Sequence, residues 1–336
     1  MVALYITSSA QGSGKTTVIA GLGKHLLGDG QKVGFFKPVM ADHQHRVENA
    51  TDSDAIFIKH IFALAEPVDQ LSPVFPDESH LAGNIKDAYA RVAQGKDVVI
   101  IEGVSDQPQL SRTIVDSLKA RVIIVAGYAE DYLKAIKNYQ NYGQDLLGIV
   151  LNKVPGRRLE SVSGELATLT DKAGVKVLGL LPEDRSLFTL TIGELVEHIH
   201  GEILSGAERS GELVENIMLG AMCVDSGPYY FGHKDNKVAV IRTERPDMQL
   251  AAMETSIRGL IIAGDKAPNP TVLSQAAAKK VPVILARETI NTLVTNIEAT
   301  LGQTRFNQES KLARLNEIMA KHFSFPVVYK GLGLTG

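Results

Sequence analysis

Nine residues near the amino terminus constrain the fold more than any other part of the chain. They read Ser-Ala-Gln-Gly-Ser-Gly-Lys-Thr-Thr over 9–17 and follow Val2–Thr7, an apolar run typical of a β-strand. A strand that leads through a glycine-containing turn into a helix starting with Gly-Lys-Thr has the layout of a phosphate-binding P-loop. Backbone N–H groups and the positive end of the helix dipole surround a polyphosphate there. The sequence therefore predicts a nucleotide site in an α/β fold.

The residues of this loop have separate expected roles. Lys15 is expected to contact the outer phosphates, and Thr16 to offer its hydroxyl to Mg²⁺. The usual pattern begins with glycine where this chain has Ser9, whereas its Gly-Lys-Thr-Thr end is intact. The nucleotide-binding residues expected in the loop are Gly12, Ser13, Gly14, Lys15, Thr16 and Thr17.

Composition and charge narrow the classes of function. The chain has 336 residues, 44% hydrophobic and 22% charged, as expected for a globular protein of two domains. A net charge of −3 gives no electrostatic support for binding nucleic acid or a membrane. No apolar run could span a bilayer, and the first strand begins too close to Met1 for a signal peptide. The single cysteine, Cys223, excludes an intrachain disulfide, and we expect a cytoplasmic protein.

Short apolar runs alternate with amphipathic segments along the first two hundred residues. The expected strands are Leu4–Thr7, Val33–Phe36, Val98–Glu102, Val122–Ala126, Gly148–Leu151 and Val177–Leu180. The expected helices include Thr16–Leu27, Asn84–Ala93, Thr113–Lys119, Tyr132–Tyr142 and Ser161–Ala173. Apolar strands separated by helices are typical of a doubly wound parallel sheet of the P-loop NTPase type. Functional residues gather beyond the carboxyl ends of the strands in that fold.

A stretch containing several glycines and serines, 206–214, is the best candidate for a linker, and the alternation of strands and helices restarts after it. The strands expected there are Ile217–Cys223, Val238–Ile241, Gly259–Ala263 and Val281–Leu285. The helices expected there are Asp247–Ser256, Thr271–Ala278, Thr289–Leu301 and Gln308–His322. We therefore expect a P-loop nucleotide-binding domain over 1–205 and a second, smaller α/β domain over 215–336.

Charged residues follow two of the expected strands. Lys37 comes directly after the second strand and could contact the terminal phosphate or an anionic substrate. Asp54, and Glu102 at the tip of a buried strand, supply the carboxylate oxygens that Mg²⁺ prefers. Asp52 precedes Asp54 by two positions, and the pair could equally cap a helix. The expected metal ligands are Thr16, Asp54 and Glu102.

Two further positions could contact the base of a nucleotide. Asn152 follows Gly148–Leu151, and its amide could hydrogen-bond a purine edge. Guanine recognition in P-loop proteins generally also uses an aspartate three residues later, where this chain has Pro155, so adenine is favoured. Pro182 follows the next strand and could pack on the base, although a strand-ending turn explains it too.

With these residues the first domain resembles the dethiobiotin synthetase class of P-loop proteins. The resemblance runs through Gly12–Thr17, Gly34–Val39, Asp54, Glu102-Gly103 and Asn152. It implies that Lys37 contacts the substrate, that Asp54 and Glu102 hold Mg²⁺, and that Asn152 recognises adenine. ATP and Mg²⁺ are then the cofactors, and Lys15 and Lys37 the candidate catalytic residues.

A second resemblance covers nearly the whole chain and is to the N-terminal region of long phosphate acetyltransferases. It rests on Val150–Val154, Leu178–Asp184 and two DRTGG-like segments, Glu215–Asp225 and Arg245–Ser256. The acetyl-transferring domain does not follow in this sequence, so we expect no phosphotransacetylase activity from the chain alone. The resemblance also implies a homodimer.

Three functions stay open at this point. The first is an ATP- and Mg²⁺-binding sensor or regulator in central metabolism, whose second domain senses a ligand or mediates assembly. The second is an ATP-dependent ligase of the dethiobiotin synthetase type that activates a small carboxylate or carbamate held by Lys37. The third is a nucleotide-insensitive assembly partner whose P-loop is structural.

Overall fold

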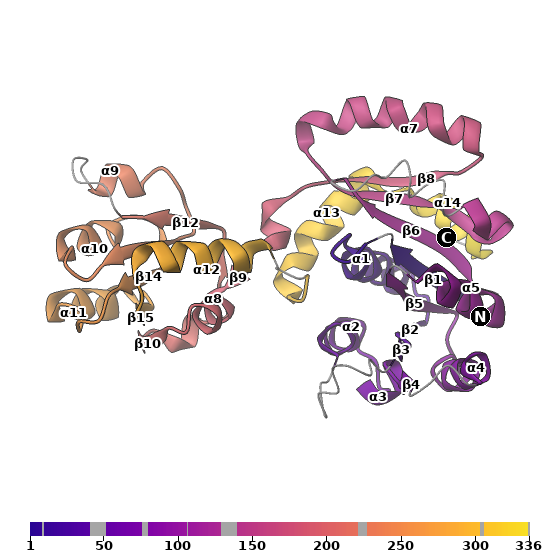
Figure 1. The fold of residues 1–336 in the computed structure, drawn as a ribbon, viewed down its shortest axis with the longest axis horizontal. Helices are drawn as coiled ribbons and strands as arrows, with labels where there is room; N and C mark the ends of the chain where they lie inside the picture. The colour runs from indigo at the N-terminus through magenta and orange to yellow at the C-terminus, as the bar shows by residue number, and fades with distance from the viewer. Residues whose placement is uncertain are drawn as a thin grey trace. The chain divides into compact units, whose positions relative to one another are not determined.

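The described chain forms two compact units (Figure 1). The computed structural model describes residues 1–8, 10–40, 52–75, 80–105, 107–128, 140–220, 227–302 and 306–334. The first unit combines Met1–Asp184 with Phe306–Gly336, and the second is Arg185–Arg305. Ser9, Cys223 and most of the expected helix Tyr132–Tyr142 lie outside the described residues.

A six-stranded parallel sheet forms the centre of the first unit, in the order β2-β5-β1-β6-β7-β8. Its strands are β1 (Val2–Ser8), β2 (Val33–Phe36), β5 (Val98–Ser105), β6 (Arg121–Gly127), β7 (Leu146–Val154) and β8 (Val177–Pro182). A separate parallel pair is β3 (Val39–Met40) with β4 (Val74–Phe75). The strand interiors are buried and apolar, as a sheet covered on both faces requires. Because β1, β5 and β6 are parallel neighbours, their carboxyl ends meet at one edge.

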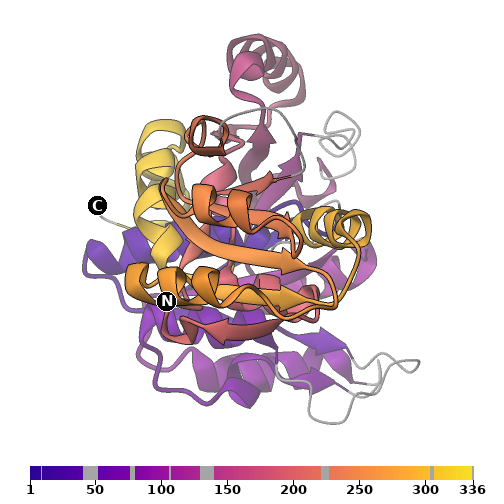
Figure 2. The same ribbon diagram turned by 90° about the vertical axis from the view of Figure 1, so that its left-hand side faces the viewer.

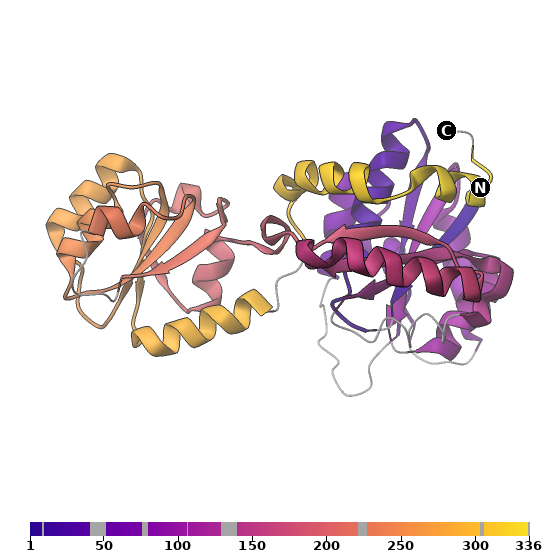
Figure 3. The ribbon, with the colours of Figure 1, turned by 90° about the horizontal axis from the view of Figure 1, so that it is seen from above.

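Helices cover both faces of this sheet, which confirms the expected doubly wound α/β class. They are α1 (Lys15–Gly28), α2 (Ser53–Phe62), α3 (Val68–Leu71), α4 (Leu81–Val92), α5 (Pro108–Leu118), α7 (Leu159–Ala173), α13 (Leu312–His322) and α14 (Phe325–Leu332). Figure 3 shows α13 and α14 on the opposite side of the sheet from α7. No helix among the described residues is both long and apolar enough to cross a membrane.

The end of the chain returns to the first unit. Helix α13 contacts α1 and β8, and Phe323 forms an isolated antiparallel bridge with Gly179 of β8. Leu315 and Met319 of α13 are fully buried. A Cβ added at Gly21 of α1 would lie 2.1 Å from the Met319 sulfur, so glycine permits this close packing. The expected domain over 215–336 therefore extends too far, because its last helices complete the core of the P-loop unit.

The second unit is a smaller α/β layer structure. Its five-stranded sheet has the order β10-β15-β14-β13-β12, and only β10 runs antiparallel to its neighbour. The strands are β10 (Glu202–Ser205), β12 (Asn216–Leu219), β13 (Lys237–Arg242), β14 (Ile257–Ala263) and β15 (Val283–Ala286), with β9 (Leu190–Thr191) and β11 (Leu213–Val214) forming a separate ladder. The helices are α8 (Ile192–His198), α9 (Gly227–Phe231), α10 (Pro246–Ala252), α11 (Pro270–Lys279) and α12 (Ile290–Gly302).

Alternate residues of β13 build two cores on the two faces of this sheet. Val238 and Val240 pack with residues of α8 and α12, whereas Ala239 and Ile241 pack with residues of α9, α10 and α11. Figures 1 and 2 show helices on both faces. This alternation follows from the two-residue period of a strand.

The expected linker over 206–214 lies inside the second unit, and the boundary falls instead between Asp184 and Arg185. Arg209 donates to both carboxylate oxygens of Glu212, at 2.5 and 2.7 Å, and to the Lys280 carbonyl at 2.5 Å. Gly206 has a φ of 75°, and an added Cβ would lie 2.7 Å from Pro282 Cα. Gly206 therefore serves a tight turn beside the second sheet, and such turns are rich in the same residue types as a linker.

Candidate functional site

The P-loop lies at the carboxyl edge of the first sheet, between β1 and α1. Gly12 and Gly14 have φ angles of 76° and 96°, which other residues adopt only with strain. Gly14 is the N-cap of α1. An added Cβ at Gly14 would lie 2.0 Å from Asn152 Nδ2, so this glycine is required by both backbone angle and space.

Asn152 joins the end of β7 to the loop. It is 5% exposed, and its Nδ2 donates a hydrogen bond to the Ser13 carbonyl at 3.0 Å. The sequence placed Asn152 near the nucleotide, but it gave no sign of this direct contact with the loop backbone. Pro182 ends β8 and pairs with Val154 of β7, close to the same edge. Recognition of adenine by Asn152 and Pro182 stays a prediction.

Lys15 reaches across the ends of two neighbouring strands. Its Nζ donates to Ser8 Oγ at 3.0 Å and to Ser105 Oγ at 2.5 Å. These serines are the last residues of β1 and β5, and their hydroxyl oxygens lie 3.0 Å apart. Ser8 was missed from the sequence, where its only signal is a hydroxyl at the end of a buried strand.

Three carboxylates surround the ammonium group of Lys37. Lys37 Nζ lies 2.9 Å from Asp52 Oδ2, 2.8 Å from Asp54 Oδ2 and 3.9 Å from Glu102 Oε1. Glu102 Oε1 also accepts a hydrogen bond from Thr16 Oγ1 at 3.2 Å. The predicted metal ligands therefore come together with the predicted substrate lysine. We call Lys37, Asp52, Asp54 and Glu102 the carboxylate cluster.

Asp52 is a helix N-cap, one of the two alternatives considered from the sequence, and it also contacts Lys37. As the N-cap of α2 it accepts a hydrogen bond from the Ala55 N–H at 3.0 Å, while the same carboxylate contacts Lys37. Asp54 lies in the first turn of α2. The start of this helix thus delivers two carboxylates to the cluster.

Glu102 is the buried acid of the site. Its side chain is 5% exposed, and no described residue forms a hydrogen bond with its buried Oε2. Burial raises the pKa of Glu102 to about 7, although the positive charge of Lys37 opposes this rise. Burial alone would lower the pKa of Lys37, but the Glu102 and Asp54 carboxylates hold it above its usual value. The cluster therefore keeps a cation beside an acid that changes charge near neutral pH.

This donor set fits Mg²⁺ bound together with phosphates. Glu102 Oε2 is a hard oxygen ligand that has no hydrogen-bond partner among the described residues. The described residues contain no group of three or more His, Cys, Asp or Glu arranged to hold a metal by themselves. Mg²⁺ is usually held by one or two carboxylates plus phosphate oxygens, so the binding of Mg²⁺ by Thr16, Asp54 and Glu102 stays a prediction.

The second unit has a cavity of about 360 Å³ at the carboxyl ends of β13, β14 and β15. Arg242 lines it from the end of β13, Glu244 from the turn after that strand, and Asp265 from the turn after β14. Arg287 and Thr289 line it from the segment between β15 and α12. Ligands of open α/β sheets bind at this edge. The sequence did not identify this cavity, because its residues are separated along the chain and both charge signs are mixed.

Two known families match most of the chain. Residues 2–189 match the family described as an AAA domain, and residues 194–300 match the DRTGG domain. The boundary between the two matches falls close to the boundary between the two compact units.

Curated relatives match either nearly the whole chain or part of it. The chain is 24% identical to a phosphate acetyltransferase of Nitrosomonas europaea over 99% of this chain and 52% of that protein. It is 24% identical to the Pseudomonas aeruginosa enzyme of the same name over 97% of this chain and 51% of that protein. The chain thus spans about half the length of these relatives. An ATP-dependent dethiobiotin synthetase of Caldicellulosiruptor saccharolyticus is 25% identical over 45% of this chain and 74% of its own length.

Solved structures give weaker likenesses. The septum site-determining protein MinD of Pyrococcus horikoshii, solved with Mg-ADP, has a TM-score of 0.35 at 22% identity, covering 55% of this chain and 83% of that one. The CBS and DRTGG regulatory region of Clostridium perfringens pyrophosphatase, solved with diadenosine tetraphosphate, has a TM-score of 0.29 at 16% identity, covering 53% and 74%. TM-scores this low support no functional inference for the chain.

Proposed function

We propose a nucleotide-dependent function for this chain, which belongs to the AAA domain family of P-loop proteins and carries a DRTGG domain. In this proposal the chain binds ATP with Mg²⁺ at the first unit and acts as a nucleotide-dependent regulator. The observation that carries it is the buried Glu102 carboxylate, which lies beside Thr16 of the P-loop and has an oxygen without a partner among the described residues.

Each residue of the site has a role in this proposal. The backbone of 12–17 and the start of α1 hold the phosphates, and Lys15 exchanges its two serine partners for phosphate oxygens. Thr16, Asp54 and Glu102 hold Mg²⁺, which neutralises phosphate charge when bound. When Asp54 and Glu102 bind Mg²⁺, the Lys37 ammonium becomes available to contact an anionic oxygen.

The regulatory part of the proposal concerns the second unit. Its cavity is lined by Arg242 and Arg287 together with the acidic residues Glu244, Asp265 and Glu288, so it is suited to a small polar ligand that carries groups of both charge signs. Similarity to phosphate acetyltransferases supports a role in central metabolism, in a cytoplasmic homodimer.

Calorimetry tests nucleotide binding directly. ATP and ADP are titrated into the full chain with and without Mg²⁺, and Lys15→Ala is compared with Lys86→Ala, an exposed lysine of α4. We expect Mg²⁺ to strengthen ATP binding, Lys15→Ala to abolish it, and Lys86→Ala to leave it unchanged. If the wild-type chain binds no nucleotide at millimolar concentrations, the proposal fails and the structural P-loop is the better explanation.

A second candidate is an ATP-dependent ligase of the dethiobiotin synthetase type. It is favoured by Lys37, whose cationic form the carboxylate cluster maintains at the edge where a substrate would meet the phosphates. ADP release is measured with and without diaminopelargonic acid and bicarbonate, and then with other small carboxylates. Stimulation that disappears in Lys37→Gln supports the ligase. ATP binding without stimulation by any acceptor supports the regulator.

A further inference from the structure

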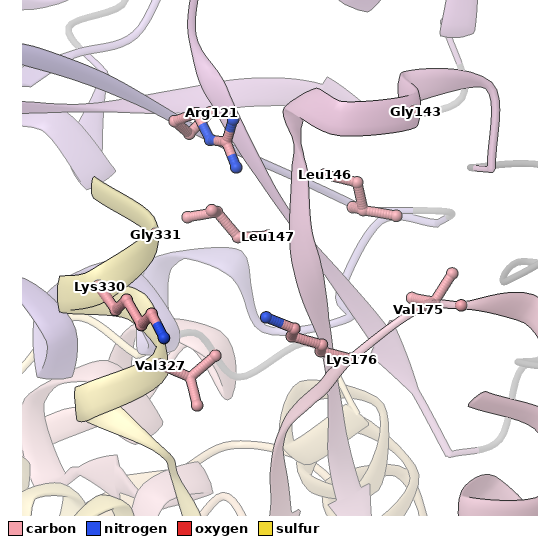
Figure 4. Close-up of a pocket in the computed structure, with 10 residues that line it drawn as sticks. Arg121, Gly143, Leu146, Leu147, Val175, Lys176, Val327, Lys330 and Gly331 are labelled. Atoms are coloured by element: carbon pink, nitrogen blue, oxygen red, sulfur yellow. The ribbon is translucent and has the colours of Figure 1, made fainter. Parts of the chain in front are cut away.

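The first unit has a cavity at the opposite edge of its sheet from the P-loop (Figure 4). Its volume is about 630 Å³. Arg121 begins β6, Leu146 begins β7 and Lys176 precedes β8, while Val327 and Lys330 contribute from α14. Because the sheet is parallel, these amino ends lie far along the strands from the carboxyl edge that carries the nucleotide site.

Positive charge dominates the walls of this cavity. Arg121, Lys176 and Lys330 are its charged lining residues, and none of the described residues that line it is acidic. Figure 4 shows their nitrogen atoms directed into the space between α14 and the sheet. No ion pair with another described residue neutralises any of the three. We call them the basic triad.

Arg121 is the most informative member of the triad. It is half-buried, and its Nε is a buried donor for which no described residue provides an acceptor. Its backbone is fixed, because Arg121 pairs with Leu4 at the start of an otherwise apolar strand. Buried donors in native proteins nearly always have a partner, so this one indicates a missing acceptor.

We propose that this cavity binds a small molecule carrying at least two negative charges, as phosphate or carboxylate groups. The planar guanidinium of Arg121 can hold either oxyanion through two parallel hydrogen bonds, while the two lysines supply point charges. Leu147 and Val327 offer apolar contact to the carbon part of such a ligand. The volume lies within the range of small-molecule sites, about 300–1,000 Å³.

This site is independent of the proposed nucleotide site, so the test uses the full chain with Lys15→Ala to exclude binding at the P-loop. Pyrophosphate and citrate are titrated by calorimetry at low ionic strength, one as the phosphate probe and the other as the carboxylate probe. We expect saturable binding of at least one of them. Arg121→Gln should weaken it at least about tenfold, because a charge-assisted pair is lost.

Two controls separate the site from general charge and from misfolding. Lys86→Gln removes an equal charge from α4 and should leave affinity unchanged. Lys330→Gln alters an exposed position of α14, where folding is not at risk, and should also weaken binding. Reaction with an amine-specific reagent, mapped by mass spectrometry, should show Lys176 and Lys330 protected by the anion and Lys86 unprotected.

The pyrophosphate and citrate titrations can either support the proposed anion site or overturn it. Binding by pyrophosphate alone assigns a phosphate ligand, and binding by citrate alone assigns a polycarboxylate. If neither anion binds the Lys15→Ala protein at millimolar concentrations, the inference is overturned. Binding that survives unchanged in the Arg121→Gln and Lys330→Gln proteins overturns it as well, because the anion is then held elsewhere.

Discussion

Replacing Glu102 by glutamine should stabilise the first unit at alkaline pH and leave it unchanged at acid pH. Glutamine has the shape of the protonated acid but cannot ionise. Burial raises the pKa of Glu102 from its usual 4.5 to about 7, so ionising this group in the folded protein is costly. The substitution removes that cost.

The sign and size follow from proton linkage. Because the folded pKa lies above the unfolded one, the folded protein keeps a proton that the unfolded chain has already released. The resulting stability is complete below pH 4.5 and is lost as pH rises through about 7. The rise of the pKa from 4.5 to about 7 corresponds to about 3–4 kcal/mol, at about 1.4 kcal/mol per pKa unit.

The assay needs a probe confined to the first unit, because a chain with two units need not unfold in one step. The protein contains no tryptophan, so Ile56→Trp on α2, at a position 47% exposed, provides a selective fluorescence signal. Urea unfolding is then compared with and without Glu102→Gln from about pH 5 to pH 8. An equal stability difference at all pH values would refute the argument, since it would show that Glu102 does not titrate in this range.

Three further predictions use the same structure. Gly14→Ala should destabilise the loop and weaken nucleotide binding more than Gly12→Ala does. Both glycines have a positive φ, but only at Gly14 does Asn152 occupy the space of the new methyl group. Equal effects of the two substitutions in urea unfolding and calorimetry would contradict this. Binding of Mg-ATP near pH 7 should release about half a proton from Glu102, and calorimetry in buffers of different ionisation enthalpy should detect it; identical heats would count against metal contact with this group. Met319→Ala should lower the free energy of unfolding of the first unit by about 2–5 kcal/mol, measured by the fluorescence of the Ile56→Trp protein. No loss of stability would mean that α13 does not belong to the core of the first unit.

The sequence predicted the parts of the fold that local patterns encode. The P-loop is a continuous motif, and each strand of the first sheet is a continuous apolar run. The gathering of Lys37, Asp54 and Glu102 was predictable because parallel strands and the segments that follow them share one edge. The hydrogen bond from Asn152 to Ser13 was not, because it joins residues 139 positions apart. A sequence pattern does not state which strand ends become neighbours at atomic distance.

The placement of the last helices shows a second limit. The amphipathic pattern over Gln308–His322 correctly predicted a helix with a buried face. Such a pattern requires an apolar partner but does not identify it, and nearness along the chain suggested the second unit. The structure instead packs Met319 on Gly21 of α1, nearly three hundred residues away in the sequence. Helix α14, which lines the basic cavity, follows from the same return of the chain.

The packing of α13 and α14 on the first unit also determines how we expect its two proposed sites to be coupled. The strand pair β1–β6 runs from Arg121 to the P-loop, but most of its residues are buried in a sheet whose close packing disfavours a second arrangement. Helix α14 lines the basic cavity, α13 packs against α1, and α1 begins at the phosphate-binding residue Lys15. We therefore expect any coupling to pass through these three helices. Linkage then requires reciprocity: the factor by which an anion at the basic triad changes ATP affinity must equal the factor by which ATP changes affinity for that anion. Competition of the two ligands for one site would instead lower the apparent ATP affinity without limit as the anion concentration rises, whereas coupling between two sites reaches a fixed factor.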